Sequence, residues 1–422
     1  MNLIGENILS KPLKELVHDM HQGINTVTEK VEYLNDGIPI IQSKHITKGF
    51  LHFEGARFLS LEDYEKYNIK YQPKVDDLLV CNIGTIGKSL RIDKENQFLI
   101  AWNLFLIKIK KEQLYSSFFA HFLNYLDYHK YFDRFLTGGT VKFINKKTMG
   151  NIPIPLPPLD QQKKIAAILD AADAYRQKTK ALIEKYDELT QSLFMDMFGD
   201  ETGSLTELGK IIKTVGGGTP SKDNEQYWNG NIPWASVKDL KSDRLNKTQD
   251  FITQAGVDNS ATRVIPNGSL IVATRMAVGR AAICEMDVAI NQDLKAIQLI
   301  GEINITYLLY LFKSKENYFD SVSSGATVKG IKIEHITKLK VNLPEIDLQN
   351  QFAERVQAIE AQKAQAQASL AGAEDLFNSL LQRAFKKRGE LLIINDEWLI
   401  INNEFHFIIN NYKLKSNYDE EK

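Results

Sequence analysis

Two long stretches of the chain carry apolar residues at alternating three- and four-residue steps. The first runs from Leu156 to Asp200, and the second runs from Leu343 to about Arg388. Spacing that averages about 3.5 residues predicts helices with coiled-coil packing. A helix of about 40 residues would be on the order of 60 Å long. Each predicted helix must therefore bury a long apolar stripe against a partner.

Each apolar stripe consists of residues that are predicted to pack against the partner helix. In the first helix they are Ile165, Ile168, Ala172, Leu182, Tyr186, Leu189 and Leu193. In the second helix they are Phe352, Val356, Ile359, Leu370, Phe377 and Leu380. Only Lys363 interrupts the second stripe. The partner is either the other helix of the same chain, in an antiparallel pair between two globular modules, or the same helix of a second chain.

The segments around these helices repeat. Leu156-Pro157 opens the first helix and Leu343-Pro344 opens the second, 187 residues later (343 minus 156). Further upstream, Gly37-Ile38-Pro39-Ile40 matches Asn231-Ile232-Pro233-Trp234. Internal repetition at this scale indicates duplicated structural units. The chain therefore has two similar halves, each with a mixed globular segment followed by one long helix.

Short apolar runs bounded by turn residues predict strands within each half, for example Leu78–Cys81 and the stretch from Phe98 to Ile109. Aromatic residues and leucines at helical spacing predict helices from Leu114 to Phe135 and from Ile305 to Phe319. The predicted fold class is α+β: two similar mixed α/β modules separated by two long antiparallel coiled-coil helices, with a pseudo-two-fold relation. The predicted boundaries are 1–155, 156–200, 201–342 and 343–390, and residues 391–422 form an extension without an assigned role.

Composition restricts the class of protein. The formal net charge is −1, so a nucleic-acid surface would need basic residues gathered in one place. Cys81 and Cys284 lie in apolar surroundings without ligand spacing, which favours two reduced core thiols and no metal site. No apolar run approaches the ~18 residues that span a membrane, and Met1 to Ser10 does not resemble a signal peptide. A cytoplasmic protein without a membrane partner is expected.

Basic and polar residues gather at matching places in both halves and are candidates for DNA contacts. Lysine and arginine contact phosphates, whereas arginine, asparagine and glutamine can also read base edges. The two glycine-bearing turns, Gly84 to Lys88 and Arg275 to Arg280, are the best candidates to enter a groove. In the first half the candidates are Lys44, His45, Lys48, Thr85, Lys88, Arg91, Lys142, Asn145, Lys146 and Lys147. In the second half they are Ser236, Lys238, Lys241, Arg275, Arg280, Lys329 and Lys332.

The run Gly216-Gly217-Gly218-Thr219-Pro220-Ser221-Lys222, followed by Tyr227-Trp228 and Ile232-Pro233-Trp234, resembles the start of a target-recognition domain. Together with the two proline-led helices, it is similar to the specificity subunit of type I restriction–modification systems. The resemblance covers roughly residues 1–390, and the first half departs from it by having Gly23-Ile24-Asn25-Thr26 in place of the glycine run.

The resemblance implies a DNA-binding scaffold without an active site or a cofactor of its own. Each module would read one half of a bipartite double-stranded target, and the helices would set the gap. Two methyltransferase (M) subunits and restriction/translocase (R) subunits would be the partners, and S-adenosylmethionine, ATP and Mg would belong to them.

Two other classes remain open. A self-contained DNA methyltransferase or nuclease would bind S-adenosylmethionine or a divalent metal by itself. However, the only Pro-Pro pair, Pro157-Pro158, lies between leucines and does not form the Asn/Asp-Pro-Pro-aromatic motif of an adenine methyltransferase. A structural coiled-coil protein without a nucleic-acid role would form an obligate dimer through the same helices.

Overall fold

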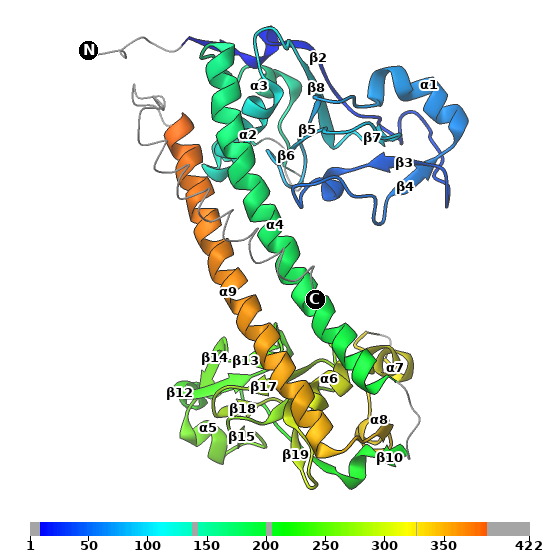
Figure 1. The fold of residues 1–422 in the computed structure, drawn as a ribbon, viewed down its shortest axis with the longest axis vertical. Coiled ribbons are helices and arrows are strands. Elements are labelled where there is room, and N and C mark those ends of the chain that lie inside the picture. The colour runs from blue at the N-terminus through cyan, green and yellow to red at the C-terminus, as the bar shows by residue number, and fades with distance from the viewer. Residues whose placement is uncertain (1–8, 137–141, 200–204, 326, 386–422) are drawn as a thin grey trace, which may run out of the picture. The chain divides into compact units, whose positions relative to one another are not determined.

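Two helices of 40 residues each are the longest elements of the structure, a computed structural model that describes residues 9–136, 142–199, 205–325 and 327–385. They are α4 (Leu159–Phe198) and α9 (Ile346–Phe385), drawn in green and orange in Figure 1. α4 begins directly after Pro158 and α9 begins two residues after Pro344, because proline disfavours the helical conformation in the residue before it. The predicted extension 391–422 lies outside the described residues.

The chain divides into two compact units, and each unit contains part of both long helices. The first unit is Met1–Lys178 with Leu370–Lys422, and the second is Thr179–Ser369. The first unit therefore holds the beginning of α4 and the end of α9, whereas the second holds the end of α4 and the beginning of α9. Each globular module is covered by segments of two helices that are distant in the sequence.

The first module contains two larger sheets and a small one. The main sheet has the order β2 (Val17–Gln22), β8 (Leu104–Ile109), β5 (Leu78–Cys81), β6 (Ser89–Arg91). The second sheet has the order β4 (Arg57–Leu59), β3 (Ile38–Ile41), β7 (Leu99–Ile100), and the small one pairs β1 (Ser10–Pro12) with β9 (Pro153–Pro155). The helices are α1 (Leu61–Tyr71), α2 (Ser116–Tyr128) and α3 (Lys146–Gly150). All four residues of β5 are buried, as expected for a short, continuous apolar run at the centre of a module.

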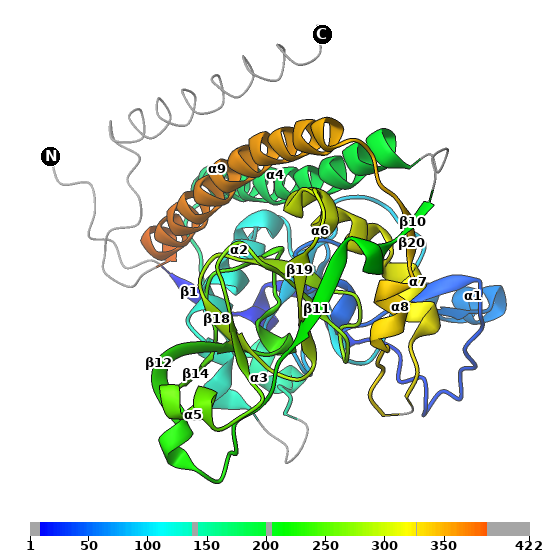
Figure 2. The same cartoon turned by 90° about the horizontal axis from the view of Figure 1, so that it is seen from below.

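The second module repeats this plan. Its main sheet has the order β11 (Ile212–Gly216), β19 (Leu294–Leu299), β16 (Leu270–Ala273), β17 (Ala281–Cys284), β13 (Arg244–Leu245). The other sheet has the order β14 (Asp250–Ile252), β12 (Trp228–Ala235), β18 (Val288–Ile290), β15 (Arg263–Ile265). The small sheet pairs β10 (Leu205–Glu207) with β20 (Lys340–Asn342), which are labelled together in Figure 2. The helices are α5 (Gln254–Asp258), α6 (Ile305–Ser314), α7 (Glu316–Val322) and α8 (Ile333–Thr337).

The two modules share strand order and strand direction. In each module the second sheet contains one parallel pair, β3 with β7 and β12 with β18, among antiparallel neighbours. The second module differs by its additional edge strands β13 and β15. The prediction of two similar mixed modules with two long helices is therefore confirmed by the topology.

A buried glutamine ties each long helix to the module that precedes it. Gln162 accepts a hydrogen bond from the Tyr115 backbone N–H at 2.8 Å and donates to the Pro157 carbonyl at 2.9 Å. Gln349 accepts from the Asn304 backbone N–H at 2.9 Å and donates to the Pro344 carbonyl at 2.7 Å. Both side chains are 1% exposed, so each amide replaces water for backbone groups at a helix start. The same contact, repeated in both halves, fixes how each long helix leaves its module.

Aromatic residues at the other end of each helix pack on the module of the other half. In the first unit the ring of Phe385 lies 5.2 Å from that of Phe118, centroid to centroid. In the second unit the ring of Phe198 lies 4.9 Å from that of Tyr307 and 5.4 Å from that of Phe352. Phe198 and Phe385 differ by the same 187 positions as the helix starts (385 minus 198). The duplication therefore extends to the contacts that hold the helices.

The contacts between α4 and α9 run antiparallel in the second unit. Phe198 meets Phe352, and eleven residues earlier on α4 (198 minus 187) Asp187 forms an ion pair with Lys363, which lies later on α9. The lysine that interrupts the apolar stripe is therefore paired across the helices. In the first unit the Arg176 guanidinium lies 4.3 Å from the ring centroid of Phe377.

Four residues of the second stripe, Phe352, Val356, Phe377 and Leu380, are buried as predicted, whereas Ile359 and Leu370 are only half-buried. The first stripe differs from its prediction. Leu189 is 50% exposed, and so does not belong to the packed face. Over many turns the 3.6-residue helix drifts from a 3.5-residue repeat, so burial moves to neighbouring positions. The buried positions absent from the prediction include Leu169, Thr179, Thr190, Phe194 and Phe198.

The helices predicted from Leu114 to Phe135 and from Ile305 to Phe319 are each interrupted. In the first module α2 ends at Tyr128, because Lys130 adopts a left-handed backbone with φ of 50° before a 3₁₀ turn at Tyr131–Phe135. In the second module α6 ends at Ser314, and α7 starts at Glu316. The apolar residues keep their helical spacing on both sides of each break. The sequence pattern therefore predicted one continuous helix where the structure has two segments.

Replacing Phe352 by alanine should lower the free energy of unfolding by about 3–5 kcal/mol, because a fully buried ring leaves a cavity in the second unit. Leu189→Ala is the matched control on the exposed face of α4, with an expected change within about 0.5 kcal/mol. Urea titrations followed by circular dichroism measure both. Equal losses for the two variants would contradict the observed helix face.

Candidate nucleic-acid interface

Two structurally matched turns lie at the ends of the buried central strands. The β5–β6 turn is Ile83 to Lys88, and the β16–β17 turn is Arg275 to Arg280. In the first, the Gly87 N–H donates to the Cys81 carbonyl at 2.9 Å, and in the second the Gly279 N–H donates to the Ala273 carbonyl at 2.9 Å. Both glycines have positive φ, and a Cβ would lie 2.4 Å from Phe132 or 2.7 Å from Phe319. Glycine is therefore required at this position in both modules.

A second basic segment lies against each turn. In the first module the Ile144 N–H donates to the Asn82 carbonyl at 3.1 Å, which brings the segment 142–147 beside the β5–β6 turn. In the second module the Ile331 N–H donates to the Thr274 carbonyl at 2.9 Å, which brings the segment 329–332 beside the β16–β17 turn. The structure thus joins two candidate clusters whose hydrogen-bonded residues are 62 (144 minus 82) and 57 (331 minus 274) positions apart in the sequence.

A third cluster is a capped 3₁₀ turn at Ser43–His45 in the first module and at Val237–Asp239 in the second. In one the His45 Nδ1 accepts a hydrogen bond from the Gln42 N–H at 2.8 Å, and in the other the Asp239 carboxylate accepts from the Ser236 N–H at 2.9 Å. Different side chains thus perform the same capping function.

Each capped turn also reaches the neighbouring clusters. The Ser43 hydroxyl donates to the Asn103 carbonyl at 3.0 Å and lies 3.4 Å from the Ile83 carbonyl. The Arg280 guanidinium donates to the Leu240 carbonyl at 3.2 Å. All three candidate clusters therefore meet at one edge of each module, which we call the basic edge: residues 42–48, 83–91 and 142–147, or residues 236–241, 275–280 and 329–332.

A sequence profile described as the type I restriction modification DNA specificity domain matches residues 10–186 and again residues 200–370. The chain belongs to the type I restriction–modification DNA specificity family. Its duplicated modules are the two copies of that domain, and the resemblance predicted from the glycine run and the proline-led helices is confirmed.

Individual relatives agree with this assignment. The EcoR124I/EcoR124II specificity subunit of Escherichia coli is 30% identical over 232 residues, which are 50% of this chain and 56% of that protein. The chain therefore spans about half the length of that relative. The putative MjaX specificity subunit of Methanocaldococcus jannaschii is 22% identical over 83% of this chain and 86% of its own length.

Solved structures show the same fold at low identity. The S subunit of a type I restriction–modification system from M. genitalium is 15% identical with a TM-score of 0.52, covering 92% of this chain and 98% of that chain. A chain from work on complex assembly and conformational transition of the type I system is 14% identical with a TM-score of 0.55, covering 92% and 100%.

Several candidate residues on the basic edges cap turns and helices within their own module. The His45 ring is 1% exposed, and burial together with the neighbouring Lys44 and His52 lowers its pKa, so the neutral ring acts as a cap. The structure therefore does not support the prediction that His45 contacts DNA. The Ser236 hydroxyl bonds Asp239 at 3.2 Å, and the Asn145 side chain caps α3 by accepting from the Thr148 N–H at 2.9 Å. Capping polar residues look like base-reading residues in a sequence because both use short side-chain amides and hydroxyls.

Other candidates already have an acidic partner. Lys88 pairs with Asp127 at 2.8 Å, and Arg91 pairs with Asp76 at 3.2 Å. The Lys111 ammonium beside Asp76 holds the pKa of that carboxyl below its usual range, so this partner is charged. The remaining paired candidates are Lys48 with Glu54 (3.6 Å), Lys238 with Asp250 (2.7 Å), Arg275 with Asp293 (3.3 Å) and Lys329 with Asp320 (2.7 Å).

A smaller set of exposed lysines has no ion pair within the described part of the chain: Lys142, Lys146, Lys147, Lys241 and Lys332. Lys44 is also exposed and donates to the Gly55 carbonyl at 2.7 Å, whereas Thr85 is exposed in the β5–β6 turn. An exposed lysine without a carboxylate partner is best suited to a phosphate, because no existing ion pair has to be broken.

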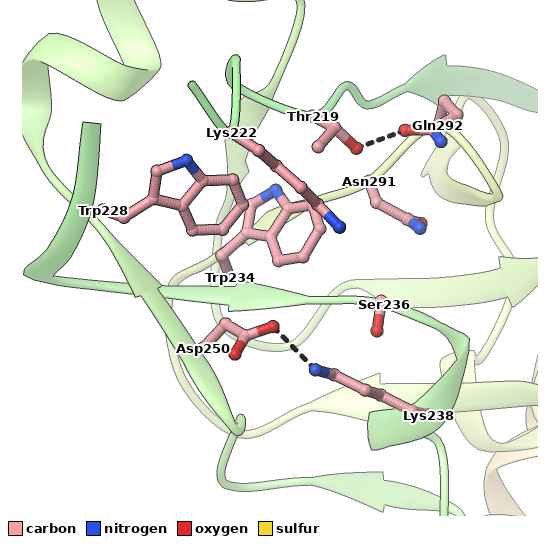
Figure 3. A pocket seen from close by; sticks show the side chains of 9 residues that line it. All are labelled: Thr219, Lys222, Trp228, Trp234, Ser236, Lys238, Asp250, Asn291 and Gln292. Carbon is pink, nitrogen blue, oxygen red and sulfur yellow. Dashed lines mark hydrogen bonds and ion pairs between the residues drawn. The ribbon is translucent and has the colours of Figure 1, made fainter. Parts of the chain in front are cut away.

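A pocket of about 520 Å³ lies beside the basic edge of the second module (Figure 3). Its aromatic wall consists of Trp228 and Trp234, whose ring centroids are 5.2 Å apart with planes at 82°. The rings are held because the Trp228 indole N–H donates to the Ser221 carbonyl at 3.0 Å and the Trp234 N–H donates to the Gly218 carbonyl at 3.1 Å. The polar side chains around them are Thr219, Lys222, Ser236, Lys238, Asp250, Asn291 and Gln292. Aromatic and amide groups together suit a planar, hydrogen-bonding ligand.

The glycine run Gly216-Gly217-Gly218, on which the resemblance to the family rests, shapes the backbone beside this pocket. A Cβ on Gly217 would lie 2.1 Å from the Ile290 carbonyl oxygen, so only glycine allows the approach of the two backbones. Gly23 has the same role in the first module, where a Cβ would lie 2.3 Å from the Ile100 carbonyl oxygen. The two entry loops, which differ in sequence, therefore match in structure at one glycine.

Both cysteines are buried and free, and burial raises the pKa of the Cys284 thiol to about 12. Within residues 9–136, 142–199, 205–325 and 327–385, no three His, Cys, Asp or Glu side chains gather as metal ligands. None of the helices in that part of the chain combines the length and apolarity needed to cross a bilayer.

His45→Asn should reduce the acid sensitivity of the first unit. The folded pKa of His45 lies below its ordinary value, so this group favours the folded state above about pH 6.5 and loses that contribution as the pH falls. Asparagine can still accept from the Gln42 N–H but does not titrate. Urea titrations from about pH 8 to about pH 5.5 measure the difference in free energy of unfolding. Wild-type and variant curves that stay parallel over this range would contradict a buried, neutral His45.

Proposed function

We propose that this protein is a specificity subunit that reads a bipartite double-stranded DNA target, one half with each module. Membership of the specificity family and the duplicated basic edge support this proposal. The single observation that carries it is the meeting of three basic segments, distant in sequence, at equivalent places in both modules. A positively charged edge built from turns can contact phosphates and present side chains to a groove.

We also propose that the chain contributes recognition and no chemistry. Methylation of adenine and ATP-driven cleavage would be carried out by two methyltransferase subunits and by restriction/translocase subunits. S-adenosylmethionine, ATP and Mg would then be cofactors of those partners. The long helices are the proposed docking surface, because parts of α4 remain exposed and apolar beside acidic residues, as at Leu189 and Met195.

The direct test is to map methylated adenines by single-molecule sequencing in cells with and without this gene. The expected result is a split motif, with two short sequences separated by a fixed gap, that disappears when the gene is deleted. An identical methylation pattern in both strains, with the partner subunits expressed, would overturn the proposed function.

The double variant Lys146→Gln/Lys147→Gln should weaken DNA binding by the complex with its methyltransferase partners and flatten its salt dependence. Each lost phosphate contact lowers the slope of log K against log salt by about 0.9, so a loss of about 2 is expected if both contact phosphates. Lys66→Gln is the control, because Lys66 is an exposed lysine on α1, outside the basic edge. Fluorescence anisotropy over a salt series measures the slope. A slope unchanged by the double variant would remove these two lysines from the interface.

A further inference from the structure

Met276 occupies an unusual position at the tip of the β16–β17 turn. Its φ is 63°, in the left-handed region that side-chain-bearing residues rarely adopt. The described residues contain five non-glycine residues with positive φ: Lys30, Asp76, Lys130, Asn229 and Met276. Met276 is the one with an apolar side chain, and that side chain is 63% exposed. Neither the backbone preference nor burial accounts for a methionine here.

The first module has the residue that this backbone favours. Gly84 occupies the matching place in the β5–β6 turn, three residues before Gly87, just as Met276 lies three residues before Gly279. Its φ is 77°, and a Cβ there would meet nothing within 4 Å. Glycine would therefore serve the fold at either position. The second module keeps a long apolar side chain despite the backbone cost, and strained residues of this kind gather at functional sites.

The turn holds Met276 in a fixed place. Its N–H donates to the Lys329 carbonyl at 3.0 Å, which ties the tip to the neighbouring segment. The preceding Arg275 pairs at 3.3 Å with Asp293, whose carboxylate is nearly buried. The Gly279 N–H closes the turn on the Ala273 carbonyl. The methionine therefore projects from an anchored turn and not from a loose loop.

The surroundings of the tip are basic. Arg275 and Arg280 flank the turn, and Lys329 lies on the segment hydrogen-bonded to it. Arg275 is paired with Asp293 and Lys329 with Asp320, so Arg280 is the one of the three without a carboxylate partner among the described residues. An apolar tip among cations does not suit a hydrophobic protein partner, because the charges would have to be desolvated. It suits DNA, where the unpaired Arg280 can face a phosphate and the apolar group can reach the bases. In the major groove the apolar group that bases present is the thymine C5-methyl.

We propose that Met276 contacts a thymine methyl in the half-site read by the second module. The inference rests on the proposed function, and it names a specificity-determining residue within it. Gly84 has no side chain that could make this contact in the first module. The matching turns would therefore read different features in the two halves of the target.

The first measurement uses the full chain in complex with its methyltransferase partners and the wild-type motif mapped beforehand. Met276→Gly should weaken binding to that motif by about tenfold, as expected for one lost base contact. Its unfolding midpoint should stay unchanged or rise, because glycine relieves the backbone. Met276→Leu, which keeps the apolar bulk, should retain most of the affinity. Val264→Ala is the control, since Val264 is an exposed apolar residue of the same module at 43% exposure.

The second measurement replaces each thymine of the half-site by uracil, which removes only the methyl group. Wild-type complex should lose affinity at one position, and the Met276→Gly complex should show no further loss there. Unchanged affinity and motif in Met276→Gly would overturn the inference. A loss in Met276→Gly that is the same on thymine and uracil DNA at every position would also overturn it. Absence of any motif with the wild-type protein would instead count against the proposed function itself.

Discussion

The apolar stripes of α4 and α9 are the constraint on which the rest of the structure depends. A 40-residue helix with one apolar face has no stable place in water unless that face is covered. Here part of each stripe is covered by its own module and part by residues from the other half of the chain, as Phe385 on Phe118 and Phe198 on Tyr307 illustrate. Neither compact unit is complete without chain from both halves.

This constraint explains why polar contacts occur where they do on the helices. Gln162 and Gln349 are buried at the helix starts because backbone groups there need a partner once water is excluded. Lys363 lies in the apolar stripe of α9 and forms its ion pair with Asp187 of α4. A charge in a helix seam specifies which residues face each other, and favours one register of the pair. Polar residues in these helices therefore direct the pairing that the apolar residues stabilise.

The basic edges show how duplication allows the two modules to diverge. The supporting backbone is conserved between the two halves, with the same turn closed by Gly87 or Gly279 and the same capped turn beside it. The side chains on that backbone differ, as His45 against Asp239 and Gly84 against Met276 do. A fixed backbone that carries exchangeable side chains is what the proposed reading of two different half-sites requires. The aromatic pocket of Trp228 and Trp234 is a further difference, because the matching strand of the first module has Ile40 where the second has Trp234.

The sequence by itself determined the duplication, the two long helices and the places where basic residues gather, because these depend on spacing along the chain. Tertiary structure decided which side of α4 is covered, so Leu189 is exposed although its spacing fits the stripe. It also decided that His45 is buried as a cap and that several candidate cations already have carboxylate partners. Burial, pairing and backbone conformation arise from residues that are distant in the chain. Met276 has no distinctive local pattern in the sequence, and only its φ and its match with Gly84 distinguish it.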